Sequence, residues 1–152
     1  MIQIFEMKHG IVELMKQNLE LGRKQSRELT KWPELMQFSP DFEKYEVAER
    51  AGTLLVLVAV ENGRLLGYSV NIIGAHLHYK DSVASFNDLL YLDPEYRGSG
   101  LGAELMDHTK AAAKERGALI QTWHAKPNTT LNRILAESPT AEMLEISYTE
   151  KL

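Results

Sequence analysis

The sequence predicts an α/β protein of one domain, with strands and helices alternating along its 152 residues. Three observations carry this prediction. Residues 54–60 (LLVLVAV) are a continuous apolar run, typical of a strand buried on both faces. The Asn62-Gly63 pair that follows is a strong hairpin signal. Residues 89–117 then have the pattern of a strand, a glycine-rich turn and a helix that stops at Gly117.

The other elements follow from apolar spacing and from turn residues. Before the apolar run we expect a strand over 1–7, a helix over 11–28 and a helix over 41–51. After it we expect a strand from 64 to about 74, a loop or irregular strand end over 75–82, and a strand over 83–92. A strand over 119–123, a short helix over about 128–136 and a last strand over 143–148 follow the glycine turn and its helix. The predicted order is therefore βααβββαβαβ.

The turn at 97–102 (RGSGLG) has the features of an anion-binding site. Its three glycines carry no Cβ, so backbone amides can come close to an anion. The helix that begins there adds unpaired N–H groups and the positive end of its dipole, and each charge–dipole contact contributes about 0.3–1 kcal/mol. The glycines by themselves are equally compatible with a tight strand-to-helix turn that binds nothing.

Two common anion-binding motifs fit this turn badly. A Walker A loop ends in Gly-Lys-Ser/Thr, whereas residues 101–103 are Leu-Gly-Ala. A dinucleotide fingerprint has the spacing Gly-x-Gly-x-x-Gly, whereas Gly98, Gly100 and Gly102 are each two residues apart.

The stretch instead resembles motif A of the Gcn5-related N-acetyltransferases (GNAT). In that motif a strand precedes Arg/Gln-x-x-Gly-x-Gly/Ala, which opens a helix. Arg97, Gly100 and Gly102 occupy the defining positions, and residues 93–96 (DPEY) are a common lead-in. The resemblance covers nearly the whole chain and implies a single acetyl-CoA-dependent acetyltransferase domain over 1–152. It implies a mixed, mainly antiparallel sheet that splays between its fourth and fifth strands, with helices on both faces.

The resemblance also implies which residues bind the coenzyme. In the family the turn binds the pyrophosphate of acetyl-CoA, and the preceding strand pairs with the pantetheine arm. The corresponding positions are Leu90, Tyr91, Leu92, Arg97, Gly98, Ser99, Gly100, Leu101, Gly102 and Asn128. The main-chain N–H of Leu92 would also stabilise the oxyanion. Asn128 could equally cap the helix that follows it.

Asp88 is the candidate base. An amine nucleophile with a pKa near ~10.4 must lose a proton before it attacks a carbonyl. In a regular strand Asp88 and Leu92 share a face and lie about 13–14 Å apart, so a water or a bulge would have to shorten the path. Small-amine acetyltransferases of the family carry an acidic residue at this offset. The alternative is an aspartate that interrupts the strand and hydrogen-bonds nearby backbone.

The sequence departs from the family at the proton donor for the leaving thiolate. The family's tyrosine falls at Leu135, which has no proton to give. Tyr91, Tyr96 and Tyr148 are substitutes, and each also suits a structural role. A thiol with a pKa of about 8.5 leaves tolerably as the thiolate, so the missing tyrosine does not exclude activity.

Composition narrows the chemistry further. The absence of cysteine excludes an acyl-cysteine intermediate and favours direct transfer, although another nucleophile such as serine remains open. His76, His78 and His124 lack a third ligand at a recognisable spacing, so we expect no metal. By analogy with the family, these histidines and Trp32 would line an acceptor pocket instead.

The function predicted is transfer of acetyl from acetyl-CoA to a primary amine of a small molecule or peptide. A non-catalytic coenzyme A-binding module is the alternative. The net charge of −4 disfavours nucleic-acid partners, including a transfer-RNA-acetylating toxin. No signal peptide or long apolar run is visible, so we expect a cytoplasmic protein without a membrane partner. A homodimer is left open, because one strand fewer than usual follows the last helix.

Overall fold

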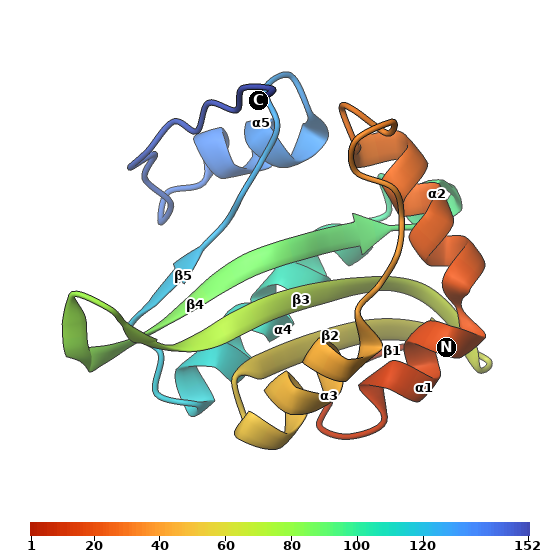
Figure 1. Ribbon diagram of the computed structural model, residues 1–152, viewed down its shortest axis with the longest axis horizontal. Coiled ribbons are helices and arrows are strands. Elements are labelled where there is room, and N and C mark those ends of the chain that lie inside the picture. The colour runs from red at the N-terminus through yellow and green to blue at the C-terminus, as the bar shows by residue number, and fades with distance from the viewer.

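The strands lie in chain order across a single sheet (Figure 1). The computed structural model describes residues 1–152. The sheet has five strands: β1 (Ile2–Met7), β2 (Leu54–Glu61), β3 (Arg64–His76), β4 (Tyr79–Leu92) and β5 (Ile120–Thr122). β1 to β4 pair antiparallel, and β5 pairs parallel to β4. The sheet is therefore mixed and mainly antiparallel, as predicted.

Helices cover both faces of the sheet, as the family resemblance implies. One face carries α1 (Ile11–Gln17), α2 (Leu19–Leu29) and α3 (Phe42–Ala51), and the other carries α4 (Leu101–Glu115) (Figure 1). The apolar run in β2 serves both layers, because successive side chains of a strand point to opposite faces. Val56 and Val58 pack with Ile11 of α1, whereas Leu55 and Leu57 pack with Leu105 of α4.

Local signals are confirmed at the turns and helix ends. Asn62 and Gly63 have φ of +50° and +79°, the left-handed pair that a two-residue hairpin requires. Asp41 caps α3 by accepting a hydrogen bond from the Lys44 N–H at 3.1 Å. Gly117 has φ of +84° just beyond α4, where a side chain would be strained.

The single helix predicted over 11–28 is wrong, because Asn18 divides it into α1 and α2. Asn18 has φ of −121°, and its side-chain amide donates to the Leu14 carbonyl at 2.9 Å. Asparagine side chains compete in this way with the helix's own hydrogen bonds.

Of the two alternatives for 75–82, the loop is wrong and the irregular strand end is observed, with a register shift between Ala75 and His76. β3 and β4 continue to His76 and Tyr79, which pair with each other, and only Leu77 and His78 form the turn.

The last strand predicted over 143–148 does not form. Residues 138–152 contain no helix or strand, and Met143, Leu144 and Tyr148 are strongly exposed. Alternation shows that a segment suits a sheet, but a strand also needs an edge to pair with. β5 spans only three residues and remains the edge of the sheet.

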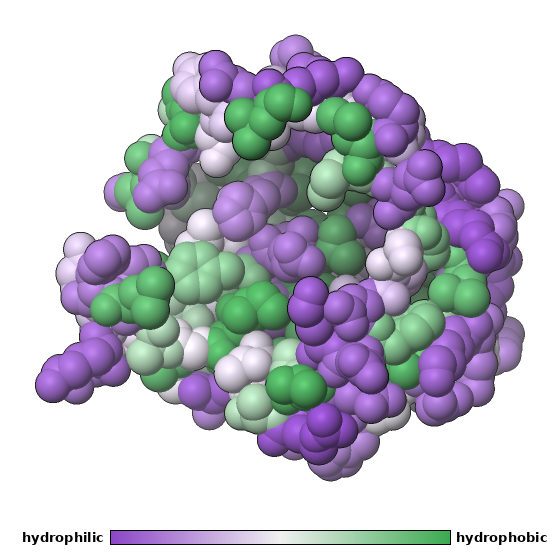
Figure 2. Space-filling model, viewed as in Figure 1, coloured by the Kyte–Doolittle hydropathy of each residue, from purple (hydrophilic) through white to green (hydrophobic).

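The sheet opens between β4 and β5. The two strands pair only from Ala84↔Ile120 to Phe86↔Thr122. The chain after β5 then diverges toward α5 (Thr130–Glu137), which lies with the C-terminal segment away from the rest of the sheet (Figure 1). The surface is hollowed between these two parts (Figure 2). No helix has the length and apolar character needed to cross a membrane.

Candidate functional site

The site is built on the side of β4 that loses its neighbour when β5 diverges. We call the main chain of residues 88–92 on this side the free edge of β4. The Asp93 N–H donates to the Leu66 carbonyl of β3 at 2.8 Å. Since peptide groups alternate in direction along a strand, the N–H groups of Leu90 and Leu92 point away from β3, where β5 supplies no partner.

The glycine turn continues from this edge into α4. Gly98 and Gly100 have φ of +79° and +90°, conformations that residues with a Cβ rarely adopt. The N–H groups of Gly98, Gly100 and Gly102 have no acceptor in the protein. Ser99 Oγ donates to the Tyr96 carbonyl at 2.7 Å, which holds the turn from within. The turn therefore presents several free amides at the N-terminus of a helix of 15 residues.

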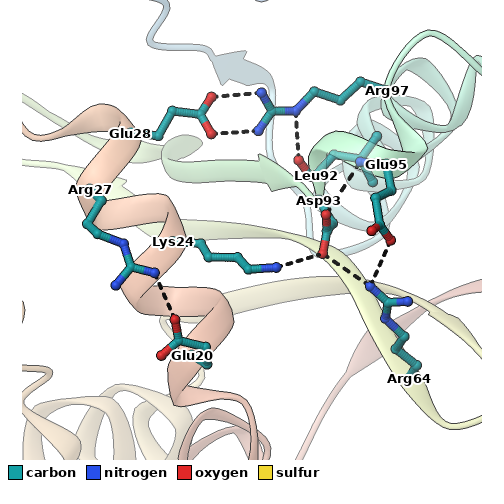
Figure 3. Close-up of polar contacts among 9 residues, drawn as sticks. All are labelled: Glu20, Lys24, Arg27, Glu28, Arg64, Leu92, Asp93, Glu95 and Arg97. Carbon is teal, nitrogen blue, oxygen red and sulfur yellow. Dashed lines mark hydrogen bonds and ion pairs between the residues drawn. The ribbon is translucent and has the colours of Figure 1, made fainter.

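Arg97 ties this turn to α2 (Figure 3). Its Nη1 and Nη2 donate to the two carboxylate oxygens of Glu28 at 2.7 and 2.8 Å, and its Nε donates to the Leu92 carbonyl at 2.9 Å. The bond from Arg97 lowers the pKa of the Glu28 carboxyl below its ordinary value. Three of the five N–H groups of this guanidinium are engaged by the protein, whereas the amides of Gly98, Gly100 and Gly102 are all free.

The start of the turn is held by a buried carboxylate. Asp93 is 3% exposed and lies between Lys24 of α2 and Arg64 of β3, at 3.7 and 3.4 Å (Figure 3). It also accepts a hydrogen bond from the Glu95 N–H at 3.4 Å, within the single 3₁₀ turn Pro94–Tyr96. A buried charge needs such partners, and here they join three parts of the fold at the end of β4.

Asp88 stands in a β-bulge. Val70 of β3 pairs with Leu89 and Asn71 pairs with Asn87, so Asp88 has no partner across the ladder. Its side chain is exposed and makes no hydrogen bond or ion pair. The alternative, an aspartate that interrupts the strand and bonds nearby backbone, holds only in part, because Asp88 interrupts the ladder but its side chain bonds no backbone group.

The bulge also breaks the alternation of faces along β4 at Asp88. Leu89 packs on the side of α1 to α3 with Tyr45, whereas Leu92 packs toward α4. Burial raises the pKa of Tyr45, and the negative charge of Asp88 adds to the rise, so the carboxylate is within electrostatic range of Tyr45. The expectation that Asp88 and Leu92 share a face assumed a regular strand, and the extra residue removes that assumption.

A buried polar network fills the sheet beside the bulge. Asn71 and Asn87 are 0% and 2% exposed. Asn87 Nδ2 lies 3.0 Å from both the Leu89 carbonyl and Asn71 Oδ1, so it spans the bulge. Gln121 of β5 donates to the same Asn71 oxygen at 3.2 Å. These side chains replace the ladder bonds that the bulge removes.

His124 joins β5 to the bulge. Its Nδ1 lies 2.6 Å from the carbonyl oxygen of Asn87, the residue just before Asp88. His76 and His78 lie instead at the tip of the β3–β4 hairpin, at the opposite end of the view from the loop after α2 that contains Trp32 (Figure 1). The predicted grouping of the three histidines with Trp32 is wrong. The protein contains no cluster of three His, Asp or Glu side chains that could hold a metal.

The remaining predicted residues are dispersed. Asn128 has φ of +61° and does not cap α5, because Thr129 takes that position by accepting from the Asn132 N–H. Tyr91 is buried with the core on the α1–α2 side, and Tyr148 is exposed in the C-terminal segment.

Sequence reasoning did not find Glu28, nor the network of Asn71 and Asn87. Two asparagines within predicted strands, where asparagine is uncommon, were the available signal for that network.

The architecture and this site define an α/β protein with a free strand edge that leads into a glycine turn with free amides. The chain belongs to the acetyltransferase (GNAT) family, whose model matches residues 16–135. It is therefore an acyltransferase. No curated protein matches the sequence.

Solved structures share the fold at low sequence identity. An aminoglycoside acetyltransferase, meta-AAC0020, from an uncultured soil metagenomic sample, in complex with sisomicin, is 18% identical with a TM-score of 0.74; the match covers 99% of this chain and 96% of that one. The ribosomal-protein-alanine N-acetyltransferase of Brucella melitensis biovar Abortus 2308 is 20% identical with a TM-score of 0.72, over 100% of this chain and 99% of that one. The aminoglycoside N-acetyltransferase AAC(6')-Iy in complex with CoA is 18% identical with a TM-score of 0.68, over 100% and 95%.

Proposed function

We propose that this protein transfers acetyl from acetyl-CoA directly to a primary amine of a small molecule or peptide. The observation that carries this proposal is the free edge of β4, which runs from the bulge at Asp88 to the amides of the glycine turn. One end of the edge suits phosphate, and the other end carries the exposed carboxylate of Asp88.

The residues of the turn fit the pyrophosphate of the coenzyme. The N–H groups of Gly98, Gly100 and Gly102 have no protein acceptor, and a Cβ at Gly98 or Gly100 would require a strained backbone. Because the Arg97 guanidinium is already engaged, its role is to fix the turn against Leu92 and Glu28. Asn128, Ser99 and Leu101 are proposed to contact the coenzyme from the loop before α5 and from the turn itself.

The main chain of β4 would hold the reacting end. Leu90, Tyr91 and Leu92 would pair with the pantetheine arm as a further strand does, through the N–H and C=O groups that face the opening. The Leu92 N–H would donate to the oxygen that becomes negative during acyl transfer, since it points away from β3 and has no other partner. The bound thioester supplies the electrophilic acyl carbon.

Asp88 would accept the proton of the acceptor amine, directly or through a water. It is exposed and unpaired, and a bulge presents it outside the strand ladder. A carboxylate there would also attract the ammonium form of an amine before the proton is lost. Small amines and peptide amines both carry the positive charge of the ammonium form, so the Asp88 carboxylate would select amines as the class of acceptor.

The test is free-thiol release from acetyl-CoA with a panel of primary amines, including aminoglycosides, polyamines and peptides. We expect turnover with at least one amine, and a fall in kcat of about 10²–10⁴-fold for Asp88→Asn with the affinity for coenzyme unchanged. Asp107→Asn is the matched control, since Asp107 lies on the exposed surface of α4 and pairs only with Lys110. Tight coenzyme binding without thiol release from any amine would contradict the proposal and support a non-catalytic binding module.

A further inference from the structure

An aromatic ring and a carboxylate hold a primary ammonium group at the border of the hollow. The Lys151 ammonium nitrogen lies 2.7 Å from Glu34 Oε1 and 5.5 Å from the centre of the Trp32 ring. Lys151 belongs to the C-terminal segment, whereas Trp32 and Glu34 belong to the loop between α2 and α3 (Figure 1). The contact therefore joins the two parts of the molecule between which the surface is hollowed (Figure 2).

The loop keeps the ring and the carboxylate within one turn. The Trp32 carbonyl accepts hydrogen bonds from the N–H groups of Leu35 and Met36, both at 3.0 Å. Farther along the loop, the Phe38 ring packs on α2 at Gly22, where a Cβ would lie only 2.7 Å from the ring. Glycine at this position lets the loop approach the helix closely, which limits the freedom of the turn.

The chemistry of the turn suits an ammonium group on an alkyl chain. A carboxylate accepts a charge-assisted hydrogen bond from an ammonium N–H, and an aromatic face attracts a cation. Leu35 and Met36 of the same turn are 57% and 68% exposed, so they offer apolar surface to methylene groups. The bond from Lys151 lowers the pKa of the Glu34 carboxyl below its ordinary value, so this carboxylate is charged in neutral solution.

Lys151 is held in a way that another ammonium group could replace. The side chains of Lys151 and Glu34 are 49% and 57% exposed, and an exposed ion pair is weak because solvent screens it. Lys31 also lies over the Trp32 ring, 5.2 Å from its centre, but it has no carboxylate partner. Lys151 alone makes both contacts.

We propose that Trp32 and Glu34 form a subsite for a second ammonium group of the acceptor, which must displace Lys151 to occupy it. This inference rests on the proposed function and narrows its acceptor to amines with two or more ammonium groups on an alkyl chain. One ammonium group loses its proton at Asp88, and the other remains charged against the Trp32 ring. A monoamine gains little from a weak exposed contact, whereas a diamine bound at one end meets the subsite at high effective concentration. Polyamines and lysine-containing peptides share this chemistry.

Binding is tested without turnover by proton–nitrogen NMR of the indole groups of Trp32 and Trp123, the two tryptophans of the chain. Spermidine and a lysine dipeptide are titrated separately into Lys151→Met, which loses the ammonium group, and into Lys114→Met as the matched control. Lys114 is exposed on α4 and has no ion pair, so the two variants have the same net charge. We expect the Trp32 signal to respond at about 2–5-fold lower ligand concentration in Lys151→Met. In Glu34→Gln the response should be lost.

Turnover tests the link to the acceptor. With acetyl-CoA as donor, kcat/KM is compared between α,ω-diamines of increasing length and monoamines of the same chain length. We expect diamines to be favoured once their length spans from Asp88 to Glu34, and this advantage to fall about 2–5-fold in Trp32→Leu. The fall should appear in KM, since the second ammonium group takes no part in the chemical step.

The outcomes separate this inference from the proposed function. Equal responses of Lys151→Met and Lys114→Met, or a diamine advantage that Trp32→Leu leaves unchanged, would overturn the inference, while thiol release from amines would leave the proposed function intact. A response of Trp32 without thiol release from any amine would overturn the proposed function and the acceptor role, and would retain the ammonium site alone. A response to spermidine only would assign the subsite to polyamines, and a response to the dipeptide only would assign it to peptides.

Discussion

The two ends of the free edge of β4 are built in different ways. At one end, the glycine turn uses consecutive residues, Gly98 to Gly102, whose own backbone angles set the positions of the free amides. At the other end, the bulge at Asp88 depends on side chains from β3, β4 and β5 that meet only in the folded protein.

The two constructions would suit two tasks: the glycine turn would bind a coenzyme that is common to all acceptors, and the bulge would handle the proton of a particular amine. Under the proposed function, coenzyme phosphates are the same for every acceptor, and backbone amides would bind them without help from any particular side chain. Proton transfer to and from an amine needs a few groups at defined distances, which a buried network can maintain. We therefore expect substitutions at the turn to change coenzyme affinity, and substitutions at the bulge to change stability and turnover.

The largest effect should come from Asn87→Ala at the bulge. This change removes the donor to Asn71 Oδ1 and to the Val70 and Leu89 carbonyls. Asn71 Oδ1 keeps its bond from Gln121, so the loss falls on the carbonyls, and each buried group left without a partner costs about 1–3 kcal/mol of unfolding free energy. Urea unfolding measures the loss, and Asn132→Ala on the exposed side of α5 is the control, with an expected change within about 0.5 kcal/mol. Equal stability of the two variants would show that the network does not hold the bulge.

The next effect concerns Gly100→Ala at the turn. Gly100 and Gly117 both have left-handed backbone, with φ of +90° and +84°, at opposite ends of α4. Alanine at either position should cost about 1–2 kcal/mol of unfolding free energy through strain. Calorimetry should show weaker coenzyme binding, by about tenfold or more, for Gly100→Ala alone, because only that end presents the free amides. Equal loss of affinity in both variants would mean that strain in the helix, and not the amides, governs binding.

The smallest effect should come from Glu28→Gln, which loosens the link between α2 and the turn. Glu28 and Arg97 are both partly exposed, so solvent screens the pair and it contributes only about 0.2–1 kcal/mol. Because Arg97 lowers the pKa of Glu28 in the folded state, this contribution is complete above the ordinary pKa of a glutamate. It disappears as the pH falls through the lowered value.

Urea midpoints of wild type and Glu28→Gln, measured at neutral pH and in acid, test this prediction. The difference between the two proteins should shrink in acid and at high salt. Glu137→Gln, which removes an exposed carboxylate of α5 that has no ion pair, should show no such trend. A difference that grows in acid would contradict the pairing.

Much of the fold could be predicted because its signals are local. The hairpin at Asn62-Gly63, the cap at Asp41 and the end of α4 near Gly117 each depend on the conformational preference of one or two residues. The apolar run in β2 was equally clear, since a strand covered on both faces needs no alternation. The last strand failed for a distant reason, because it has no edge to pair with, whereas the break at Asn18 came from a local side-chain bond that the apolar spacing does not show.

The sequence by itself determined that a strand enters a glycine turn and a helix, and hence where free amides would meet an anion. Only the tertiary structure decided that Asp88 leaves the ladder, that Arg97 binds Glu28, and that His124 bonds to the Asn87 carbonyl. The physical reason is the range of the interactions. Backbone angles depend on each residue and its neighbours, whereas strand register and buried polar contacts depend on which segments meet.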